Sequence, residues 1–121
     1  MSWFDFRQNN SGGHFHVDDR VGHYVLIEAT SHHRANKRAE EIGIYFDGVE
    51  DDRDCDCCGD RWDRQSSYDA GTETPTLYGK ELDEFEPDFM GDEPVVVMVY
   101  PLEGEPYRHE YTRFGTQNDQ D

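Results

Sequence analysis

The chain lacks any long apolar segment and has few basic residues. No stretch of its 121 residues approaches the roughly 18 consecutive apolar residues that a membrane-spanning helix needs, so the sequence predicts no contact with a membrane. Lys and Arg total 11 against 28 Asp and Glu, which gives a formal net charge of −17. Because such a charge repels phosphate backbones, we expect no direct binding of nucleic acid.

Motifs of nucleotide-binding and hydrolytic enzymes are also missing. The sequence contains no P-loop, no G-x-G-x-x-G and no G-x-S-x-G. Carboxylates are so numerous that a pair at catalytic spacing carries no information. The acidic residues around the cysteines would raise the thiol pKa, which disfavours a nucleophilic cysteine. We therefore expect a protein that is not an enzyme and that has no cofactor, although binding of zinc is possible.

The three cysteines do not make a secreted disulfide framework. Cys55, Cys57 and Cys58 lie within four positions, and an odd number in one cluster does not suit a set of paired bridges. Residues 1–7 contain no basic segment followed by an apolar run, so they do not resemble a signal peptide. The expected compartment is a reducing cytosol.

What the sequence does contain suits one small domain. Only 34% of the residues are hydrophobic, but 13% are aromatic and each aromatic side chain buries a large area. We expect a single α+β domain over residues 1–114 and a flexible tail over 115–121.

Alternating and β-branched runs predict the strands of this domain. The run over 95–100 is the most continuous and predicts a strand covered on both faces. A turn centred on Gly104 then joins it to the last strand in a hairpin. Strands are predicted over residues 3–7, 14–17, 21–29, 44–46, 95–100 and 107–112.

One helix is predicted between two of these strands. Ser31 can cap a helix over about 32–42, and Ala35, Ala39 and Ile42 fall on one narrow apolar stripe. Gly43 suits the left-handed position after the last turn. The order of elements predicts an α+β fold: a small, mostly antiparallel sheet with one helix packed on a face and long acidic connections. A single helical turn is expected over 81–85.

The segment Asp-Cys-Asp-Cys-Cys-Gly-Asp-Arg-Trp, residues 54–62, allows three interpretations. Cys55, Cys57 and Cys58 could bind zinc together with a histidine, for which His14 and His16 are the candidates. However, structural zinc sites usually use two separated knuckles, and this chain has one C-x-C-C cluster. The D-x-D-x-x-G spacing also matches the start of a calcium loop, but Gln65 stands where a bidentate Glu belongs.

The third interpretation is a tight structural turn. In that case Gly59 adopts a left-handed conformation and Asp60 accepts hydrogen bonds from turn amides. Arg61 then pairs with a nearby carboxylate, and Trp62 enters the core.

Acidic residues dominate from residue 47 onward. Residues 1–46 carry six carboxylates and five Lys or Arg, whereas 81–93 carry seven carboxylates and no cation. Interleaved apolar side chains could combine electrostatic steering with anchoring on a basic partner, although solubility or adaptation to salt would produce the same composition. The candidate partner-binding residues are Asp51, Asp52, Asp54, Asp56, Glu81, Asp83, Glu84, Phe85, Glu86, Asp88 and Phe89.

Three segments in the first half of the chain are distinctive. They are Ser-Trp-Phe-Asp-Phe-Arg-Gln-Asn-Asn-Ser-Gly-Gly (2–13), the pattern Ala35-Asn36, Ala39-Glu40 and Ile-Gly-Ile-Tyr-Phe-Asp-Gly (42–48), and the cysteine segment 54–62. Together they resemble a family of small proteins from tailed bacteriophages. The resemblance implies a phage origin and the cytoplasm of an infected bacterial host. It carries over no activity and no catalytic residue.

The charge distribution and the missing catalytic motifs predict a protein that acts by protein binding, and the resemblance implies that it is a phage accessory protein. The expected partner is a host or phage protein with a basic surface, and a nucleic-acid mimic that inhibits a defence or transcription component would fit this charge. The alternatives are a small zinc-binding module built on the cysteine cluster and a minor virion component.

Overall fold

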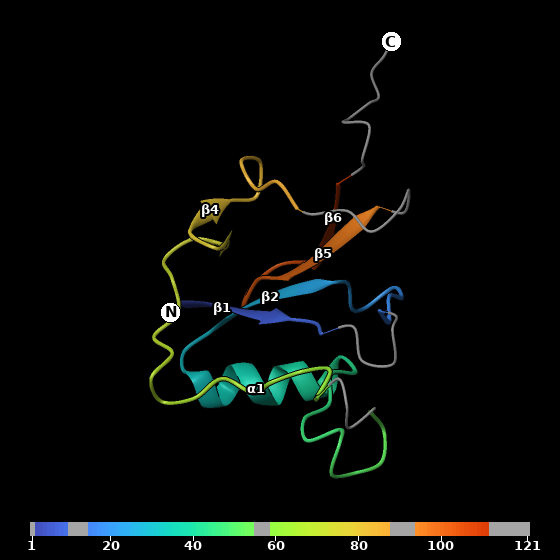
Figure 1. Cartoon of the computed structure of the whole chain (residues 1–121). Helices are drawn as coiled ribbons and strands as arrows, with labels where there is room; N and C mark the ends of the chain where they lie inside the picture. Colours follow the sequence, from blue (N-terminus) through green and yellow to red (C-terminus); the bar gives the residue numbers. More distant parts are fainter. Residues whose placement is uncertain (1, 10–14, 55–58, 88–93, 112–121) are drawn as a thin grey trace.

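The computed structural model of the protein describes residues 2–9, 15–54, 59–87 and 94–111. Its elements are β1 (Ser2–Arg7), β2 (Tyr24–Ala29), α1 (His32–Glu41), β3 (Thr76–Leu77), β4 (Lys80–Glu81), β5 (Val95–Tyr100) and β6 (Tyr107–Tyr111). A four-stranded sheet with the order β1-β2-β5-β6 forms the centre, and β3 and β4 form a separate two-stranded sheet (Figure 1). The predicted α+β class is confirmed.

The central sheet is mixed. The pairs β1–β2 and β5–β6 are antiparallel, whereas β2 and β5 are parallel. The chain between β2 and β5 contains α1 and the β3–β4 hairpin, which lie on opposite sides of the sheet (Figure 1). The sheet is therefore covered on both faces, and all six residues of β5 are buried, as the β-branched run predicts.

Alternation along β2 divides the core into two clusters. On one side, which we call the helix face, Val25 and Ile27 pack with Ala35 and Ala39 of α1. On the other side, which we call the hairpin face, Leu26 packs with residues of the β3–β4 region such as Leu77, Leu82 and Phe85. Because successive side chains of a strand point to opposite faces, one strand supports both clusters.

The helix follows its predicted bounds. The Ser31 hydroxyl accepts a hydrogen bond from the Arg34 amide at 3.2 Å, and Ala35 and Ala39 are completely buried against the sheet. At the other end Gly43 has φ +108°, and its amide donates to Glu40 O at 3.2 Å. These contacts confirm both predicted caps.

The strand predicted over 44–46 is wrong. The Ile44 amide donates to Ala39 O at 3.0 Å, which completes a Schellman motif at the end of α1. This bond draws Ile44 back onto the helix, and the left-handed Asp47 (φ +59°) then turns the chain. Ile44 and Phe46 are buried in the helix-face cluster without joining a strand.

The strand expected over 14–17 is not formed by Phe15, His16 or Val17, and His14 lies outside the described residues. The Gln8 carboxamide takes the place of a neighbouring strand. Its oxygen accepts from the His16 amide at 2.5 Å, and its nitrogen donates to His16 O at 2.9 Å. A side chain thus satisfies the backbone groups that a strand would have paired.

Two further predictions concern the ends of the chain. The last strand and the turn at Gly104 (φ +112°) are confirmed, while Thr112 and the tail predicted over 115–121 lie outside the described residues. No helix within the described ranges is long and apolar enough to span a membrane.

Candidate functional site

The candidate partner-binding residues do not form one surface. Residues 81–86 belong to the region that covers the hairpin face, whereas 47–54 lie beside the segment that covers the helix face (Figure 1). The sheet separates them. We therefore treat them as two features, the acidic turn (residues 81–86) and the acidic loop (residues 47–54).

The acidic turn follows β4 as one helical turn, as predicted. The amides of Glu84 and Phe85 both donate to Glu81 O, at 2.9 and 3.0 Å. Leu82 and Phe85 point into the hairpin-face cluster and are each 8% exposed. The turn is also held from the sheet, because the Tyr111 hydroxyl donates to Leu82 O at 2.5 Å.

An aromatic cluster underlies the turn. The Phe85 ring packs edge-on against Tyr24 and Tyr111, each with a centroid distance of 5.5 Å, and stacks on Tyr78 at 5.9 Å. The Arg7 guanidinium covers the Tyr78 ring at 4.8 Å. Such pairs add to the stability that burial alone provides. The turn therefore has a fixed base on the sheet.

The carboxylates of the turn point outward. Glu81, Asp83, Glu84 and Glu86 are exposed, and within the described ranges none of them forms an ion pair. Glu81 accepts a hydrogen bond from the Thr74 hydroxyl at 2.8 Å. Four negative charges thus project from a segment whose backbone and apolar side chains are anchored.

The pKa of Tyr111, at the base of the turn, is shifted by its surroundings. Burial raises the pKa of the Tyr111 hydroxyl to about 12, and the negative charge of Asp83 raises it as well. The neutral phenol is therefore the stable form, and it remains a hydrogen-bond donor to the turn over the ordinary pH range.

Phe85 and Asp54 require correction as partner-binding residues. Phe85 is an internal anchor, because its ring belongs to the hairpin-face cluster. The Asp54 side chain is 0% exposed. Asp51 and Asp52 are exposed as expected, while Asp56, Asp88 and Phe89 lie outside the described residues.

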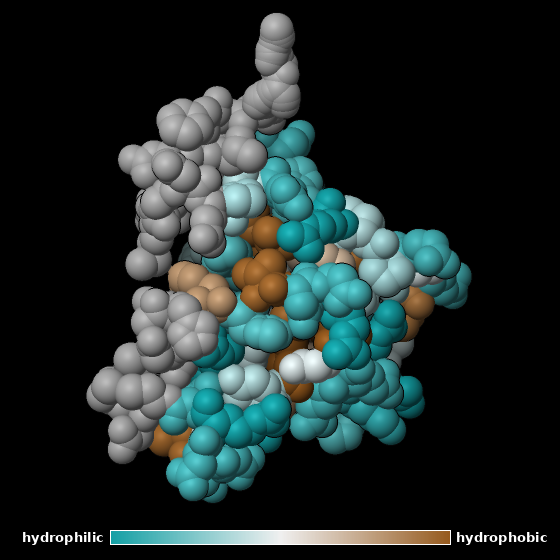
Figure 2. Space-filling view, turned by 90° about the vertical axis from the view of Figure 1, so that its right-hand side faces the viewer, coloured by the Kyte–Doolittle hydropathy of each residue, from teal (hydrophilic) through white to brown (hydrophobic). Residues whose placement is uncertain are grey.

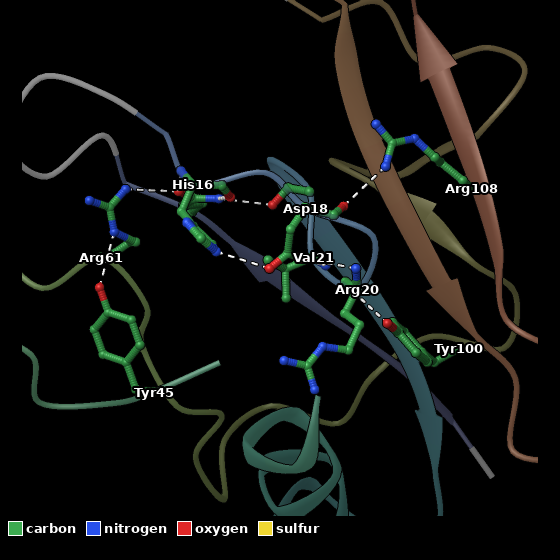
Figure 3. Close-up of polar contacts among 10 residues, drawn as sticks. His16, Asp18, Arg20, Val21, Tyr45, Arg61, Tyr100 and Arg108 are labelled. Atoms are coloured by element: carbon green, nitrogen blue, oxygen red, sulfur yellow. Dashed lines mark hydrogen bonds and ion pairs between the residues drawn. The ribbon is translucent and has the colours of Figure 1, made fainter. Parts of the chain in front are cut away.

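Asp54 belongs to a buried polar network at the base of the acidic loop. One carboxylate oxygen accepts from the Tyr45 hydroxyl at 2.7 Å, and the other accepts from the Arg61 amide at 2.7 Å. The Arg61 guanidinium lies 3.7 Å from the Asp54 carboxylate and donates to Gln8 at 2.9 Å. It also donates to the Tyr45 hydroxyl at 3.1 Å (Figure 3). Burial and the hydrogen bond with Asp54 raise the pKa of Tyr45.

This network confirms the features of the predicted structural turn. Gly59 is left-handed with φ +88°, and Asp60 accepts from the Val49 amide at 2.9 Å. Trp62 is 2% exposed, in the helix-face cluster. The Asp54 carboxylate, which would be the first calcium ligand of such a loop, is thus engaged inside the fold.

The zinc site stays a prediction. Cys55, Cys57, Cys58 and His14 lie outside the described residues. His16 is described, and its imidazole Nε2 lies 3.0 Å from the Asp18 carboxylate on the surface. Within the described ranges no three His, Cys, Asp or Glu side chains are grouped as metal ligands would be.

Sequence reasoning missed the roles of Gln8 and Tyr45. Gln8 is 8% exposed and holds residues of three separate segments through its carboxamide. Its position directly after β1 gives no signal of this, because an amide after a strand is usually solvated. Tyr45 falls in an apolar run, and only its distant partners reveal a polar role.

The surface of the described residues also carries hollows. One, of about 300 Å³, lies between β1 and residues 65–72, and exposed Tyr68 and Tyr78 line it. Another, of about 360 Å³, lies beside α1. On the face shown in Figure 2, hydrophilic side chains surround small apolar areas. The large hydrophobic side chains that are exposed among the described residues are Val17, Tyr68, Tyr78, Leu102 and Tyr107, and of these Tyr68 and Tyr78 line the same hollow.

Comparison with known proteins identifies the family but no better characterised relative. The chain belongs to the family described as domain of unknown function DUF7296, whose model matches residues 1–120. No curated protein and no solved structure matches it. The family model thus covers the central sheet, the acidic turn and the acidic loop together.

Proposed function

We propose that the protein is a phage accessory protein that binds a host or phage protein with a basic surface, in the cytoplasm of the infected bacterium. The acidic turn is the contact surface in this proposal. Its four exposed carboxylates are Glu81, Asp83, Glu84 and Glu86. The target is a surface that itself binds nucleic acid, so that the protein acts as a mimic of a phosphate backbone and inhibits a defence or transcription component.

The observation that carries the proposal is the anchoring of the acidic turn. Leu82 and Phe85 are buried and the Tyr111 hydroxyl holds Leu82 O, so the position of the charges is set before a partner arrives. Preorganisation reduces the conformational entropy that binding would cost. A solvated acidic tail that served solubility alone would need no such anchors.

Charge distribution provides further support. The net charge of −17 steers a basic partner toward the protein over long distances, and the exposed carboxylates of the turn supply short-range complementarity. Such a complex should form quickly and weaken as salt is added, because salt screens exposed charges beyond about 10 Å at 0.1 M.

Capture from host lysate with a matched pair of variants tests the proposal. In the test variant, Glu81, Asp83, Glu84 and Glu86 are replaced by Gln or Asn. The control variant also loses four negative charges, but at exposed residues elsewhere. These are Glu40 and Glu41 of α1 and Glu103 and Glu105 of the β5–β6 turn.

We expect a basic protein to be retained by the wild type and the control and released by salt. The test variant should retain it at least tenfold less. Equal retention by both variants would refute the acidic turn as the contact surface. Capture that is insensitive to salt would refute electrostatic docking altogether.

The mimicry component has its own test. Duplex DNA added to the captured complex should displace the partner if both occupy the same basic groove. If DNA and the protein bind the partner simultaneously, protein binding stands but mimicry does not.

A further inference from the structure

The outer edge of β6 is open within the described part of the chain. β6 is the last strand in the order β1-β2-β5-β6, and β5 is the strand that it pairs with. Its residues Tyr107–Tyr111 are exposed or half-buried. Unpaired strand edges present a row of backbone donors and acceptors that another strand can complete.

The direction of the backbone groups along β6 follows from β5. The Val96 amide donates to the His23 imidazole at 3.1 Å, so Val96 directs its backbone groups toward β2. Val97, the next residue, therefore directs its own toward β6, where it pairs with His109. By the same alternation the backbone N–H and C=O groups of Arg108 and Glu110 point outward, to the open edge.

The side chains of β6 are distributed in a self-complementary way. The sequence Tyr107-Arg108-His109-Glu110-Tyr111 has a cation and an anion placed symmetrically about His109, with a tyrosine beyond each. Arg108 and Glu110 lie on the same face of the strand, where their side chains are 2.6 Å apart. Arg108 also donates to Asp18 O at 3.0 Å, which fixes its direction (Figure 3).

We propose that β6 is a homodimerisation edge, on which the β6 strands of two copies pair antiparallel about a two-fold axis at His109. Arg108 of each copy then lies opposite Glu110 of the other, and Tyr107 lies opposite Tyr111. The two four-stranded sheets join into one continuous sheet. The contact is isologous, as a two-fold interface requires.

This register agrees with both the backbone and the charges. Arg108 and Glu110 carry the outward backbone groups, so their pairing across the axis allows each pair to exchange two N–H···O bonds. A register centred on Arg108 would place two arginines opposite each other, and one centred on Glu110 would oppose two glutamates. Like charges directly opposite are destabilising, so the register centred on His109 is selected.

The dimer is expected to be weak. A contact made by one five-residue strand is smaller than the interfaces of about 1,200 to 2,000 Å² that hold stable complexes. The net charge of −17 on each copy also opposes association at low ionic strength. Measurements should therefore use high protein concentration and about 0.15 M salt, at which long-range repulsion is screened.

Two single substitutions and their mixture provide a sharp test. Arg108→Glu and Glu110→Arg each place like charges opposite each other in the homodimer, so each variant alone should dimerise on the order of tenfold less, as measured by sedimentation velocity. An equimolar mixture of the two variants restores opposite charges at both pairs. It should sediment as a dimer at concentrations at which each variant alone is a monomer.

Controls separate this effect from changes in net charge or folding. Glu105→Arg makes the same charge change as Glu110→Arg outside β6 and should leave dimerisation unchanged. Glu110→Pro removes an outward N–H that β5 does not use, which an edge strand tolerates, and should abolish the dimer. Thermal unfolding of each variant verifies that the fold is retained.

Amide hydrogen exchange gives an independent readout. The amides of Arg108 and Glu110 should become protected as the wild-type concentration rises, whereas the amide of His109, which faces β5, should be protected at every concentration. The proposal is overturned if the wild type remains monomeric up to millimolar concentration. It is equally overturned if the single variants dimerise as well as the wild type.

Discussion

The two faces of the central sheet are covered in different ways. The helix face is covered by α1 and by a segment in which some acidic side chains make contacts inside the fold. Asp54, for example, contacts Tyr45 and Arg61 there. The hairpin face is covered by a short hairpin and the acidic turn, in which apolar and aromatic side chains make the internal contacts and the carboxylates project outward.

This difference shows that acidic composition has two physical uses in one small protein. In the acidic loop the Asp54 carboxylate fixes the backbone by accepting hydrogen bonds from the Arg61 amide and the Tyr45 hydroxyl. In the acidic turn the backbone is already held by Leu82 and Phe85, and its carboxylates are exposed to solvent, where the proposed partner would bind. The substitutions below should therefore affect folding alone on the helix face, whereas on the hairpin face some should affect both folding and docking.

The largest effect is expected for Asp54→Ala. The substitution removes the Asp54 carboxylate that lies beside the buried Arg61 guanidinium and that accepts from the Arg61 amide. Removing one partner of a buried ion pair costs about 3 to 5 kcal/mol of the free energy of unfolding, which urea denaturation measures. Asp51→Ala, which removes an exposed carboxylate of the same loop, should have no measurable effect. If Asp54→Ala and Asp51→Ala lowered the free energy of unfolding equally, the structural role of Asp54 would be contradicted.

Phe85→Ala should reduce both stability and docking. Truncation of a buried phenylalanine costs about 3 to 5 kcal/mol, and the 8% exposure of Phe85 places the effect toward the lower end. The acidic turn also loses its aromatic base, so partner retention should fall even though all four carboxylates remain. If retention from lysate were unchanged in a folded Phe85→Ala protein, anchoring of the turn would not matter for binding.

The same glycine substitution should have unequal effects on the two faces. A Cβ at Gly48 would lie 2.0 Å from the Asp54 carboxylate, so Gly48→Ala must displace the buried network and should cost about 1 to 3 kcal/mol. A Cβ at Gly79, between β3 and β4, meets nothing within 4 Å, and Gly79→Ala should cost only the strain of its φ of +79°, about 1 kcal/mol. A reversed order of the two unfolding free energies would show that the buried network tolerates displacement.

Much of the fold could be predicted from local patterns. The Ser31 cap, the alanine stripe of α1, and the strands at 95–100 and 107–111 each depend on residues close together in the chain. The strand predicted over 44–46 failed because the Schellman motif captures the Ile44 amide. Periodicity identifies apolar positions, but it does not show where their backbone hydrogen bonds go.

The candidate site was less predictable, because similar acidic segments lie on opposite sides of the sheet. Nothing local distinguishes Asp54, whose side chain is buried, from Asp51 and Asp52, which are exposed. The distinction depends on Tyr45 and Arg61, which reach Asp54 only in the folded chain. The structural interpretation of residues 59–62 succeeded because each residue type favours one environment. Glycine favours a left-handed backbone, arginine a nearby carboxylate and tryptophan the core.

The smallest effect is expected at Tyr111, which links the sheet to the acidic turn. At neutral pH, Tyr111→Phe removes the hydrogen bond to Leu82 O and should cost about 1 kcal/mol.

The folded-state pKa of about 12 lies above the value of about 10 for an unfolded tyrosine, so the folded state retains the proton more strongly. The stability that this group contributes is therefore fully present below pH 10 and is lost as the pH rises from 10 to 12. Urea unfolding across this range should show a shallower decline for Tyr111→Phe than for the wild type, while Tyr68→Phe, which alters a ring that is 95% exposed, should follow the wild type. Identical pH profiles for Tyr111→Phe and the wild type would mean that the hydroxyl does not hold the turn, and the fixed base that separates the hairpin face from the helix face would then depend on Leu82 and Phe85 alone.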